Sequence, residues 1–261
     1  MNFSSFSTEL ERRHLADLRF SDVTRALRAL SSAYVERRET ALAGRRALDG
    51  AGKRAAFALY YGPIHFLLVQ HIARELGVTP GRGTVVDLGC GTGVAGAAIA
   101  TSLGAEALAK AAAPAGPPAL HVLGIDTHPW SLEEARFTYQ AFGLRCDVRR
   151  GHAARMRFPS DTSVIVAAFV VNELNDADRA ALLREFIRLK ADTTQADATR
   201  ILVVEPISTR ISPWWPEWVE TLGAAAHEWR VRVDAPPIVK RLAKAAGLRP
   251  EVLTARSLFV G

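Results

Sequence analysis

The sequence predicts an α/β fold of the doubly wound type with a helical N-terminal extension. Three observations indicate this fold. An apolar run at residues 85–88 ends in a turn rich in glycine, and apolar runs then alternate with helical spacing toward the end of the chain. Residues 1–80 show helical spacing and no convincing strand. Alternating strands and helices are typical of an open sheet covered by helices on both faces.

The glycine-rich turn at residues 85–94, VVDLGCGTGV, predicts a strand that turns sharply into a helix. Gly89, Gly91 and Gly93 alternate along it, and glycine takes positive φ values and lets the backbone approach a ligand closely. A helix is expected from Val94 to Leu103, with its first N–H groups directed at that ligand. The turn is therefore expected to bind a cofactor mostly through its backbone.

Two cofactor classes fit this turn. Gly91, Gly93 and Gly96 match the G-x-G-x-x-G spacing of dinucleotide-binding enzymes. Asp87, however, precedes the first glycine by two, where a carboxylate would repel a pyrophosphate but attract the ammonium group of S-adenosylmethionine. The segment D-L-G-C-G-T-G resembles motif I of the class I S-adenosylmethionine-dependent methyltransferases.

The later elements follow the same alternation. The predicted strand at 120–126 ends at Asp126, a carboxylate suited to accept hydrogen bonds from two ribose hydroxyls in either cofactor class. Residues 105–119, rich in Ala, Gly and Pro, are expected to be a surface extension. The remaining expected elements are a helix at 130–142, strands at 145–150 and 163–171, a helix at 176–190, a strand at 201–206, a helix at 237–246 that stops at Gly247, and closing strands within 251–260.

The N-terminal extension is most apolar between residues 55 and 76. Tyr60, Tyr61 and His65 lie there at spacings near one helical turn, and Pro63 is expected to start or kink a helix. We expect residues 1–80 to form a helical extension or lid, and residues 81–261 to form the cofactor-binding domain.

Composition excludes several classes of protein. The chain has 261 residues, 49% of them hydrophobic, which is enough for a full core. Its two cysteines give no disulfide framework, and no metal site is expected. No apolar run reaches the roughly 20 residues needed to cross a bilayer, so we expect a cytoplasmic protein without a membrane partner.

The net charge of +6 is concentrated near the N-terminus, because residues 1–60 hold 11 Lys and Arg against 7 Asp and Glu. Such a basic segment could contact the phosphates of a nucleic acid. Acidic and basic residues are interspersed, however, as in Glu36–Glu39, and that pattern is more typical of solvated helix faces.

The methyltransferase resemblance implies a Rossmann-like fold with a mostly parallel seven-stranded sheet, and S-adenosylmethionine as the cofactor. The residues that it implies for cofactor binding are Asp87 and the backbone of Gly89, Gly91 and Gly93 at the methionine portion, Asp126 at the ribose, and Thr127 beside the adenine. At the next position, the turn Gly151–Ala153 replaces an acidic residue with His152. Either the His152 ring accepts a bond from the adenine amino group, or the Ala153 backbone binds the base. Phe169 either packs on the adenine or fills the core.

A second resemblance rests on two shorter motifs, F-V-V-N-E-L at 169–174 and V-V-E-P at 203–206. They are similar to segments of the mitochondrial ribosomal small-subunit methyltransferase-like family and its bacterial relatives. Members of that family often carry a cysteine cluster for an iron–sulfur centre. This chain has no cysteine after Cys146, which weakens an inference of ribosomal work.

The acceptor site is expected where strands four and five end. Asn172, Glu173 and Glu205 are the candidate catalytic residues, although each could instead cap a loop. Candidate acceptor-binding residues are aromatic or lie in the apolar extension: Tyr60, Tyr61, His65, Trp214 and Trp215. The tryptophans could stack on a planar or cationic acceptor, or could anchor the helical extension.

These expectations describe an S-adenosylmethionine-dependent methyltransferase. A small-molecule acceptor is slightly favoured, because the aromatic segment and the apolar stretch from Tyr60 to Leu68 indicate an enclosed, dry site. The alternatives are an RNA or ribosomal small-subunit methyltransferase, and a ribosome assembly factor that binds the cofactor without turnover.

Overall fold

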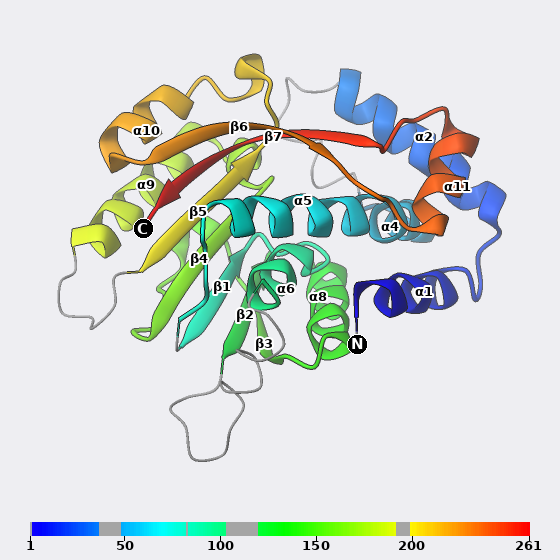
Figure 1. Cartoon of the computed structure of the whole chain (residues 1–261), viewed down its shortest axis with the longest axis horizontal. Coiled ribbons are helices and arrows are strands. Elements are labelled where there is room, and N and C mark those ends of the chain that lie inside the picture. Colours follow the sequence, from blue (N-terminus) through cyan, green and yellow to red (C-terminus); the bar gives the residue numbers. More distant parts are fainter. Residues whose placement is uncertain (1, 37–47, 82, 103–119, 192–198) are drawn as a thin grey trace. The chain divides into compact units, whose positions relative to one another are not determined.

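The computed structural model describes residues 2–36, 48–81, 83–102, 120–191 and 199–261 (Figure 1). The surface extension expected at 105–119 lies outside these residues. The chain divides into two compact units, residues 1–68 with 230–253 and residues 69–229 with 254–261. This division differs from the expected boundary at residue 80. It falls inside a helix, and it gives a segment from the C-terminal half of the chain to the first unit.

A seven-stranded sheet has the order β3-β2-β1-β4-β5-β7-β6. Its first five strands in that order are parallel, and β7 runs antiparallel to β5. The strands are β1 (Thr84–Leu88), β2 (His121–Asp126), β3 (Arg145–Arg150), β4 (Thr162–Ala168), β5 (Arg200–Glu205), β6 (Ala225–Arg232) and β7 (Val252–Val260). The strand order reverses between β1 and β4, and this is where ligands of doubly wound folds bind. The predicted fold class is confirmed.

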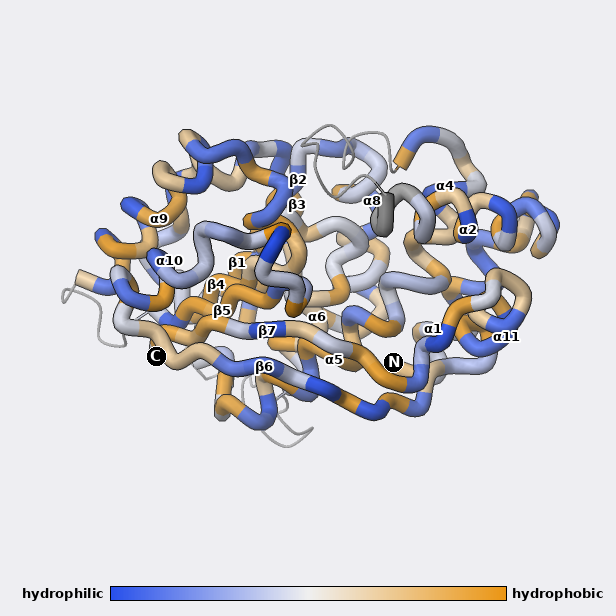
Figure 2. Tube along the Cα trace, turned by 90° about the horizontal axis from the view of Figure 1, so that it is seen from above, coloured by the Kyte–Doolittle hydropathy of each residue, from blue (hydrophilic) through white to orange (hydrophobic). Residues whose placement is uncertain are grey.

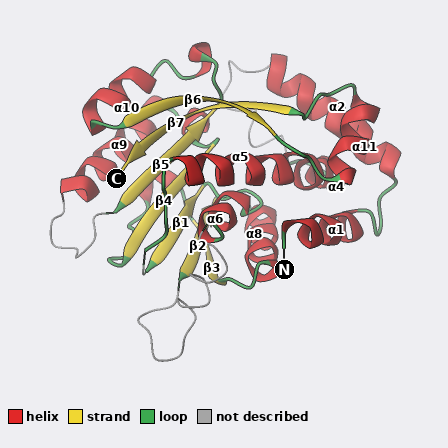
Figure 3. Ribbon diagram, in the orientation of Figure 1, coloured by secondary structure: helices red, strands yellow, loops and turns green. Residues whose placement is uncertain are grey.

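Helices lie on both faces of this sheet (Figure 3). Val86, Leu88 and Ile165 point to the face where they pack with buried residues of α9 (Asp176–Ala191) and α10 (Trp215–Leu222). Side chains alternate along a strand, so the neighbouring residues face α6 (Val94–Ala100) and α8 (Pro129–Ala141). Burial on both faces explains why the central strands are continuous apolar runs, which stand out along β1, β4 and β5 in Figure 2.

The first unit consists mainly of helices. They are α1 (Phe3–His14), α2 (Phe20–Glu36), α4 (Ala51–Ala56), the π-helical turn η1 (Phe57–Tyr61), the start of α5 (Gly62–Glu75), and α11 (Pro237–Ala246). Phe3 stacks on Phe66 with ring centroids 4.7 Å apart. The Arg241 guanidinium donates a 2.9 Å hydrogen bond to Glu11, so residues from both ends of the sequence pack in this unit.

Helix α5 begins at Gly62, one residue before Pro63, so this proline lies in the first turn of a helix, as expected. The helical path continues through it by way of η1, where the Gly62 N–H bonds to the Phe57 carbonyl in a wide turn. Proline lacks an N–H and clashes with the carbonyl four residues earlier in a regular α-helix. A widened turn directly before Pro63 relieves both problems without breaking the helix.

The structure contains elements that the sequence did not predict. Helix α10 and strand β6 were missed, and β7 alone occupies the region where closing strands were expected. Strand β4 ends at Ala168, three residues before its predicted end, because Phe169 has a φ of 60°. No helix among the described residues is long and apolar enough to span a membrane.

Candidate active site

The turn after β1 has the conformation that its glycines predict. Gly89, Gly91 and Gly93 have φ values of 68°, 50° and 76°, and α6 begins at Val94. A Cβ atom on Gly89 would lie 2.3 Å from Cγ2 of Val170, far inside van der Waals contact. The absence of a side chain at Gly89 therefore brings the turn after β1 against the segment that follows β4.

The N–H groups of two of these glycines are already bonded within the protein. The Gly91 N–H donates to Oδ2 of Asp126 at 3.0 Å, and the Gly93 N–H donates to the Cys90 carbonyl at 2.6 Å. These glycines therefore let a ligand approach the backbone closely, but these two N–H groups are already used as donors within the protein.

Asp87 is 1% exposed and holds two helices to β1. Its Oδ2 accepts a 2.7 Å hydrogen bond from the Gly96 N–H of α6 and a 2.8 Å bond from the Tyr139 hydroxyl of α8. Burial raises the pKa of Asp87 to about 7; these two bonds oppose that rise and nearby Asp126 adds to it. A cation beside this carboxylate would favour its ionised form.

Asp126 joins the turns that follow β1 and β2. Its Oδ1 accepts a 2.8 Å bond from the His128 N–H, and its Oδ2 accepts the bond from Gly91. Each carboxylate oxygen can accept a second hydrogen bond, so this half-buried side chain keeps capacity for two hydroxyl groups. Thr127, beside it, is exposed.

Two buried hydroxyl groups near these turns lack a hydrogen-bond partner among the described residues. They are Oγ1 of Thr92, in the glycine-rich turn, and Oγ of Ser131, at the start of α8. A buried polar atom without a partner costs roughly 1–3 kcal/mol. A polar ligand at these turns would supply the missing partners, so the residues present fit a nucleoside cofactor.

The turn after β3 commits both ring nitrogens of His152 to protein groups. Its Nδ1 accepts a 3.4 Å bond from the Ala154 N–H, and its Nε2 lies 3.6 Å from Oδ2 of Asp178. With Nδ1 as an acceptor, the ring proton is on Nε2, facing the carboxylate. This geometry favours the second of the two predicted alternatives, in which the Ala153 backbone binds the adenine.

Phe169 begins the segment 169–175, which we call the acceptor loop. Its N–H donates to the Val204 carbonyl at 2.8 Å, and its positive φ is the only one at a non-glycine residue in the described chain. Such a conformation costs a bulky residue on the order of 1–3 kcal/mol and clusters at functional sites. Phe169 is half-buried and is not among the fully buried core residues, and its packing on the adenine stays a prediction.

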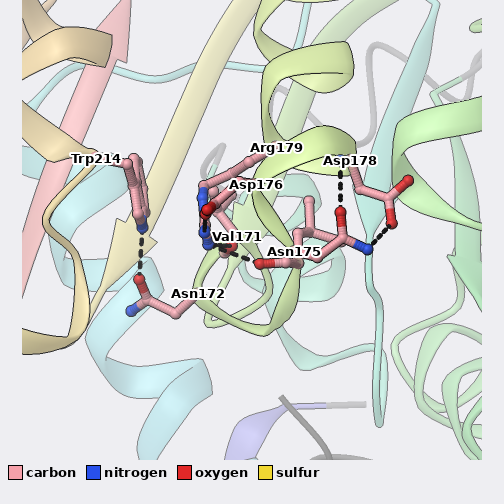
Figure 4. Close-up of polar contacts among 8 residues, drawn as sticks. Val171, Asn172, Asn175, Asp176, Asp178, Arg179 and Trp214 are labelled. Atoms are coloured by element: carbon pink, nitrogen blue, oxygen red, sulfur yellow. Dashed lines mark hydrogen bonds and ion pairs between the residues drawn. The ribbon is translucent and has the colours of Figure 1, made fainter. Parts of the chain in front are cut away.

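Asn172 is held on both sides of its amide. Its Nδ2 donates to Oε2 of Glu205 at 2.7 Å. Its Oδ1 accepts a 2.9 Å bond from Nε1 of Trp214 (Figure 4). Oε1 of Glu205 also accepts bonds from the N–H groups of Val171 and Asn172, at 2.7 and 3.3 Å. Glu205 is fully buried, and burial raises its pKa to about 8 despite these bonds. Glu205, the last residue of β5, therefore holds the loop in place through its bonds to Val171 and Asn172.

Glu173 is exposed, yet protein atoms surround it on several sides. Desolvation, reinforced by the negative charge of Asp126, raises the pKa of Glu173 to about 7. Water also reaches this side chain and moderates the rise. Glu173 also acts on Glu205, whose pKa it raises further.

The predicted tryptophans form part of the core. Trp214 and Trp215 are each 8% exposed, and Trp214 packs edge-on against Trp218 with centroids 4.8 Å apart. The Arg256 guanidinium covers Trp215 at 4.3 Å from its ring centroid. An acceptor therefore cannot stack on that face of Trp215 as the protein stands. Trp214 acts on the site through its bond to Asn172.

The three predicted acceptor residues of the extension belong to the first unit. Tyr60 is 5% exposed and meets Tyr61 edge-on at 5.1 Å, and Tyr61 lies 5.8 Å from the His65 ring. Burial raises the pKa of both tyrosines to about 12 and lowers that of His65 to about 4. These contacts lie within the first unit, and a role in acceptor binding stays a prediction.

Sequence reasoning missed four polar residues around the site: Tyr139, Asp178, Arg179 and Arg256. Each would pass as an ordinary helix or strand residue in the sequence. Among the described residues, no group of His, Cys, Asp and Glu could hold a metal ion.

Comparison with known proteins gives the class of this site. Residues 85–192 match a protein-family model described as a methyltransferase domain. That segment runs from β1 through the acceptor loop to the end of α9, so it contains the turns described above. The chain therefore contains a methyltransferase domain. S-adenosylmethionine is accordingly the cofactor of this methyltransferase.

Two solved structures are similar to this chain at low sequence identity. A protein proposed to be an O-methyltransferase, from Nostoc punctiforme, is 16% identical with a TM-score of 0.52, covering 92% of this chain and 69% of that one. A methyltransferase from Aquifex aeolicus is 15% identical with a TM-score of 0.45, covering 73% and 87% of the two chains. No curated protein sequence matches this methyltransferase.

Proposed function

We propose that this methyltransferase acts on a small, neutral or cationic acceptor that binds beside the acceptor loop. In this proposal Asn172 orients the acceptor, and Glu173 accepts a proton where the acceptor must lose one. Asp126 binds the ribose of the cofactor, and the Ala153 backbone binds its adenine. The cofactor supplies an activated methyl group on a sulfonium, so the protein has mainly to position the acceptor.

The observation that carries the proposal is the fixed amide of Asn172. An amide nitrogen has two hydrogens and an amide oxygen has two lone pairs. Glu205 takes one of those hydrogens, and Trp214 fills one of those lone pairs. One donor and one acceptor remain, and the two bonds fix their directions. A polar group that is held in this way before the acceptor arrives loses little entropy when it orients that acceptor.

Glu173 has the properties of a general base. A base works best when its pKa lies near the working pH, and the pKa of Glu173 is raised to about 7. It neighbours Asn172, the residue proposed to orient the acceptor. Proton acceptance by Glu173 would be required for an acceptor such as an ammonium or a hydroxyl, and not for a neutral tertiary amine.

The charge of the site supports a small acceptor over a nucleic acid. Asp126, Glu173 and Glu205 lie near enough for Asp126 to raise the pKa of Glu173, and for Glu173 to raise that of Glu205. Negative potential from those carboxylates of the group that are ionised repels phosphates and attracts a cation. A polyanionic acceptor would have to overcome this repulsion at the point of transfer.

The test is a screen of small amines and hydroxyl compounds with S-adenosylmethionine, followed by formation of S-adenosylhomocysteine. We expect Glu173→Gln to lower kcat by about 100-fold or more on a proton-bearing acceptor. S-adenosylhomocysteine affinity should stay within a few-fold. Glu133→Gln, at an exposed position on α8, is the matched control and should retain full activity. Full activity of Glu173→Gln would refute the proposed role of Glu173.

A second candidate function is methyl transfer to RNA. Strand β3 is an edge of the sheet, and its residues Arg145, Arg149 and Arg150 are exposed. Such a basic edge could bind phosphates, although charged residues on an edge strand also prevent sheets from pairing. The second candidate requires RNA binding that weakens with salt, together with methylated RNA as the product. Replacement of these three arginines by glutamine should then reduce the salt dependence.

A further inference from the structure

The first turn of α9 contacts two loops: the acceptor loop that directly precedes it, and the turn at residues 152–155. Asn175 caps this helix, since its Oδ1 accepts a 2.9 Å bond from the Asp178 N–H and its Nδ2 donates to Oδ2 of Asp178 at 2.7 Å. The capped turn places two side chains of opposite charge, Asp178 and Arg179, next to each other in sequence. Each side chain is 14% exposed, so neither is an ordinary surface charge.

Arg179 is bonded to the acceptor loop (Figure 4). Its Nη1 donates to the Leu174 carbonyl at 2.7 Å and to the Val171 carbonyl at 3.2 Å, and its Nη2 pairs with Asp176. The guanidinium carbon lies 6.0 Å from the ring centroid of Trp214. One side chain therefore satisfies two main-chain carbonyls of the loop and approaches the tryptophan that holds Asn172.

The position of the Arg179 charge needs an explanation, because positive charge near a helix N-terminus opposes the helix dipole. Arg179 stands four residues into α9. A residue chosen only to stabilise this helix would be neutral or acidic at that position. The bonds to Val171 and Leu174 explain why an arginine occurs at this position, whereas helix stability does not.

Asp178 contacts the turn where the adenine is proposed to bind. Its Oδ2 lies 3.6 Å from Nε2 of His152, and its Oδ1 lies 3.9 Å from Nη2 of Arg155. His152 and Arg155 flank the short helical turn at Ala153, the residue whose backbone is proposed to bind the base. The carboxylate of Asp178 therefore fixes this turn from the side of α9.

We propose that Asp178 and Arg179 are positioning residues, which hold the adenine-binding turn and the acceptor loop in fixed positions relative to each other. Arg179 fixes the acceptor loop, and with it the direction of the Asn172 amide. Asp178 fixes the turn at 152–155, and with it the position of the cofactor's base. The roles assigned to the two loops rest on the proposed function. The contacts that Asp178 and Arg179 make with these loops do not.

The experiment follows the indole resonance of Trp214, whose N–H bonds to Asn172, by NMR of the full chain. The protein has five tryptophans, and Trp214→Phe assigns the resonance by its disappearance. Arg179→Gln should shift this resonance toward the position of a free indole and speed its exchange with water by on the order of tenfold. Arg179→Lys keeps the charge but not the fork that reaches two carbonyls, and should show most of the same change. Arg184→Gln, at an exposed position on α9, should leave the resonance in place.

A calorimetric titration with S-adenosylhomocysteine separates the two residues. Asp178→Ala should weaken binding by about fivefold, and Arg179→Gln should leave it within twofold. Asp178→Asn, which keeps an acceptor for the His152 ring, should fall between Asp178→Ala and the unmodified protein. An unchanged indole in Arg179→Gln, or unchanged affinity in Asp178→Ala, would overturn the proposal. Neither measurement uses an acceptor, so the outcome does not depend on whether the proposed acceptor class is correct.

Discussion

Gly89 illustrates at the scale of one residue how the site is assembled. Its positive φ and its contact with Val170 both exclude a side chain. We predict that Gly89→Ala destabilises the protein by about 2–4 kcal/mol, combining backbone strain with overpacking. S-adenosylhomocysteine affinity should fall with it, because the turn after β1 and the acceptor loop can no longer touch. Urea unfolding and calorimetry measure the two effects.

Gly143 provides a matched control for that prediction. Its φ of 71° is nearly the same as that of Gly89, but a Cβ atom there would meet nothing within 4 Å. Gly143→Ala should therefore show the backbone strain alone, about 1 kcal/mol, with unchanged ligand affinity. Equal losses of stability in the two variants would mean that the contact with Val170 contributes nothing.

Tyr139 carries a second prediction at this scale, because it is one of two donors to the buried Asp87 carboxylate. Tyr139→Phe should cost about 1–3 kcal/mol at pH 8, where that carboxylate is ionised. The pKa of Asp87 is already raised to about 7, and losing a donor raises it further. The cost should therefore be smaller at pH 5, where Asp87 is protonated in the folded protein. Urea titrations at the two pH values check this, and a cost that does not change with pH would contradict it.

At the scale of elements, the parallel strands could be predicted because both of their faces are buried. Strands β1, β2 and β5 appear in the sequence as apolar runs that end in an acidic residue. Strand β6 could not be predicted in this way, because nearly all of its residues are at least partly exposed. Helix α10 was hidden by the prolines around its tryptophans, although Pro216 occupies a first-turn position that proline tolerates.

The site could be predicted in part, for a related reason. The glycine-rich turn and the acids at the strand ends are local patterns, and the fold fixes which strand ends meet. The contacts of Asn172 with Glu205 and Trp214 join residues 33 and 42 positions apart, and no local pattern encodes them. Arg179 occupies an ordinary helical position, so its role emerges only when the acceptor loop folds back over it.

Trp214 gives the prediction that belongs to this scale, because it connects α10 to the acceptor loop. Trp214→Phe keeps most of the packing but leaves Oδ1 of Asn172 without its donor. We expect a loss of about 1–3 kcal/mol in unfolding free energy, and a fall in kcat that exceeds any change in S-adenosylhomocysteine affinity. Trp218→Phe is the control, because Trp218 packs against Trp214 in the same core cluster. Equal falls in kcat for the two variants would refute the role of the indole N–H.

For the whole molecule, the two units should respond to pH in opposite directions. In the first unit, burial lowers the pKa of His65 from 6.5 to about 4, so the unfolded chain binds more protons than the folded one between these values. Stability is then lost as the pH falls from about 6.5 to about 4, by up to about 3 kcal/mol. In the second unit, burial raises the pKa of Asp87 to about 7 and that of Glu205 to about 8. There the folded state binds more protons, and stability is lost as the pH rises from about 4 to about 8.

Hydrogen exchange, corrected for the intrinsic effect of pH, can follow the two units separately in one sample. Peptides from 51–66 should lose protection toward pH 4, and peptides from 162–175 should lose protection toward pH 8. His65→Gln should remove the acid sensitivity of the first set alone, since glutamine does not titrate. Glu205→Gln should reduce the response of the second set alone and leave the part that Asp87 contributes. If both sets lost protection in the same direction, or if either substitution altered the other unit, the two units would unfold as one cooperative body, and these buried groups would not set their stabilities independently.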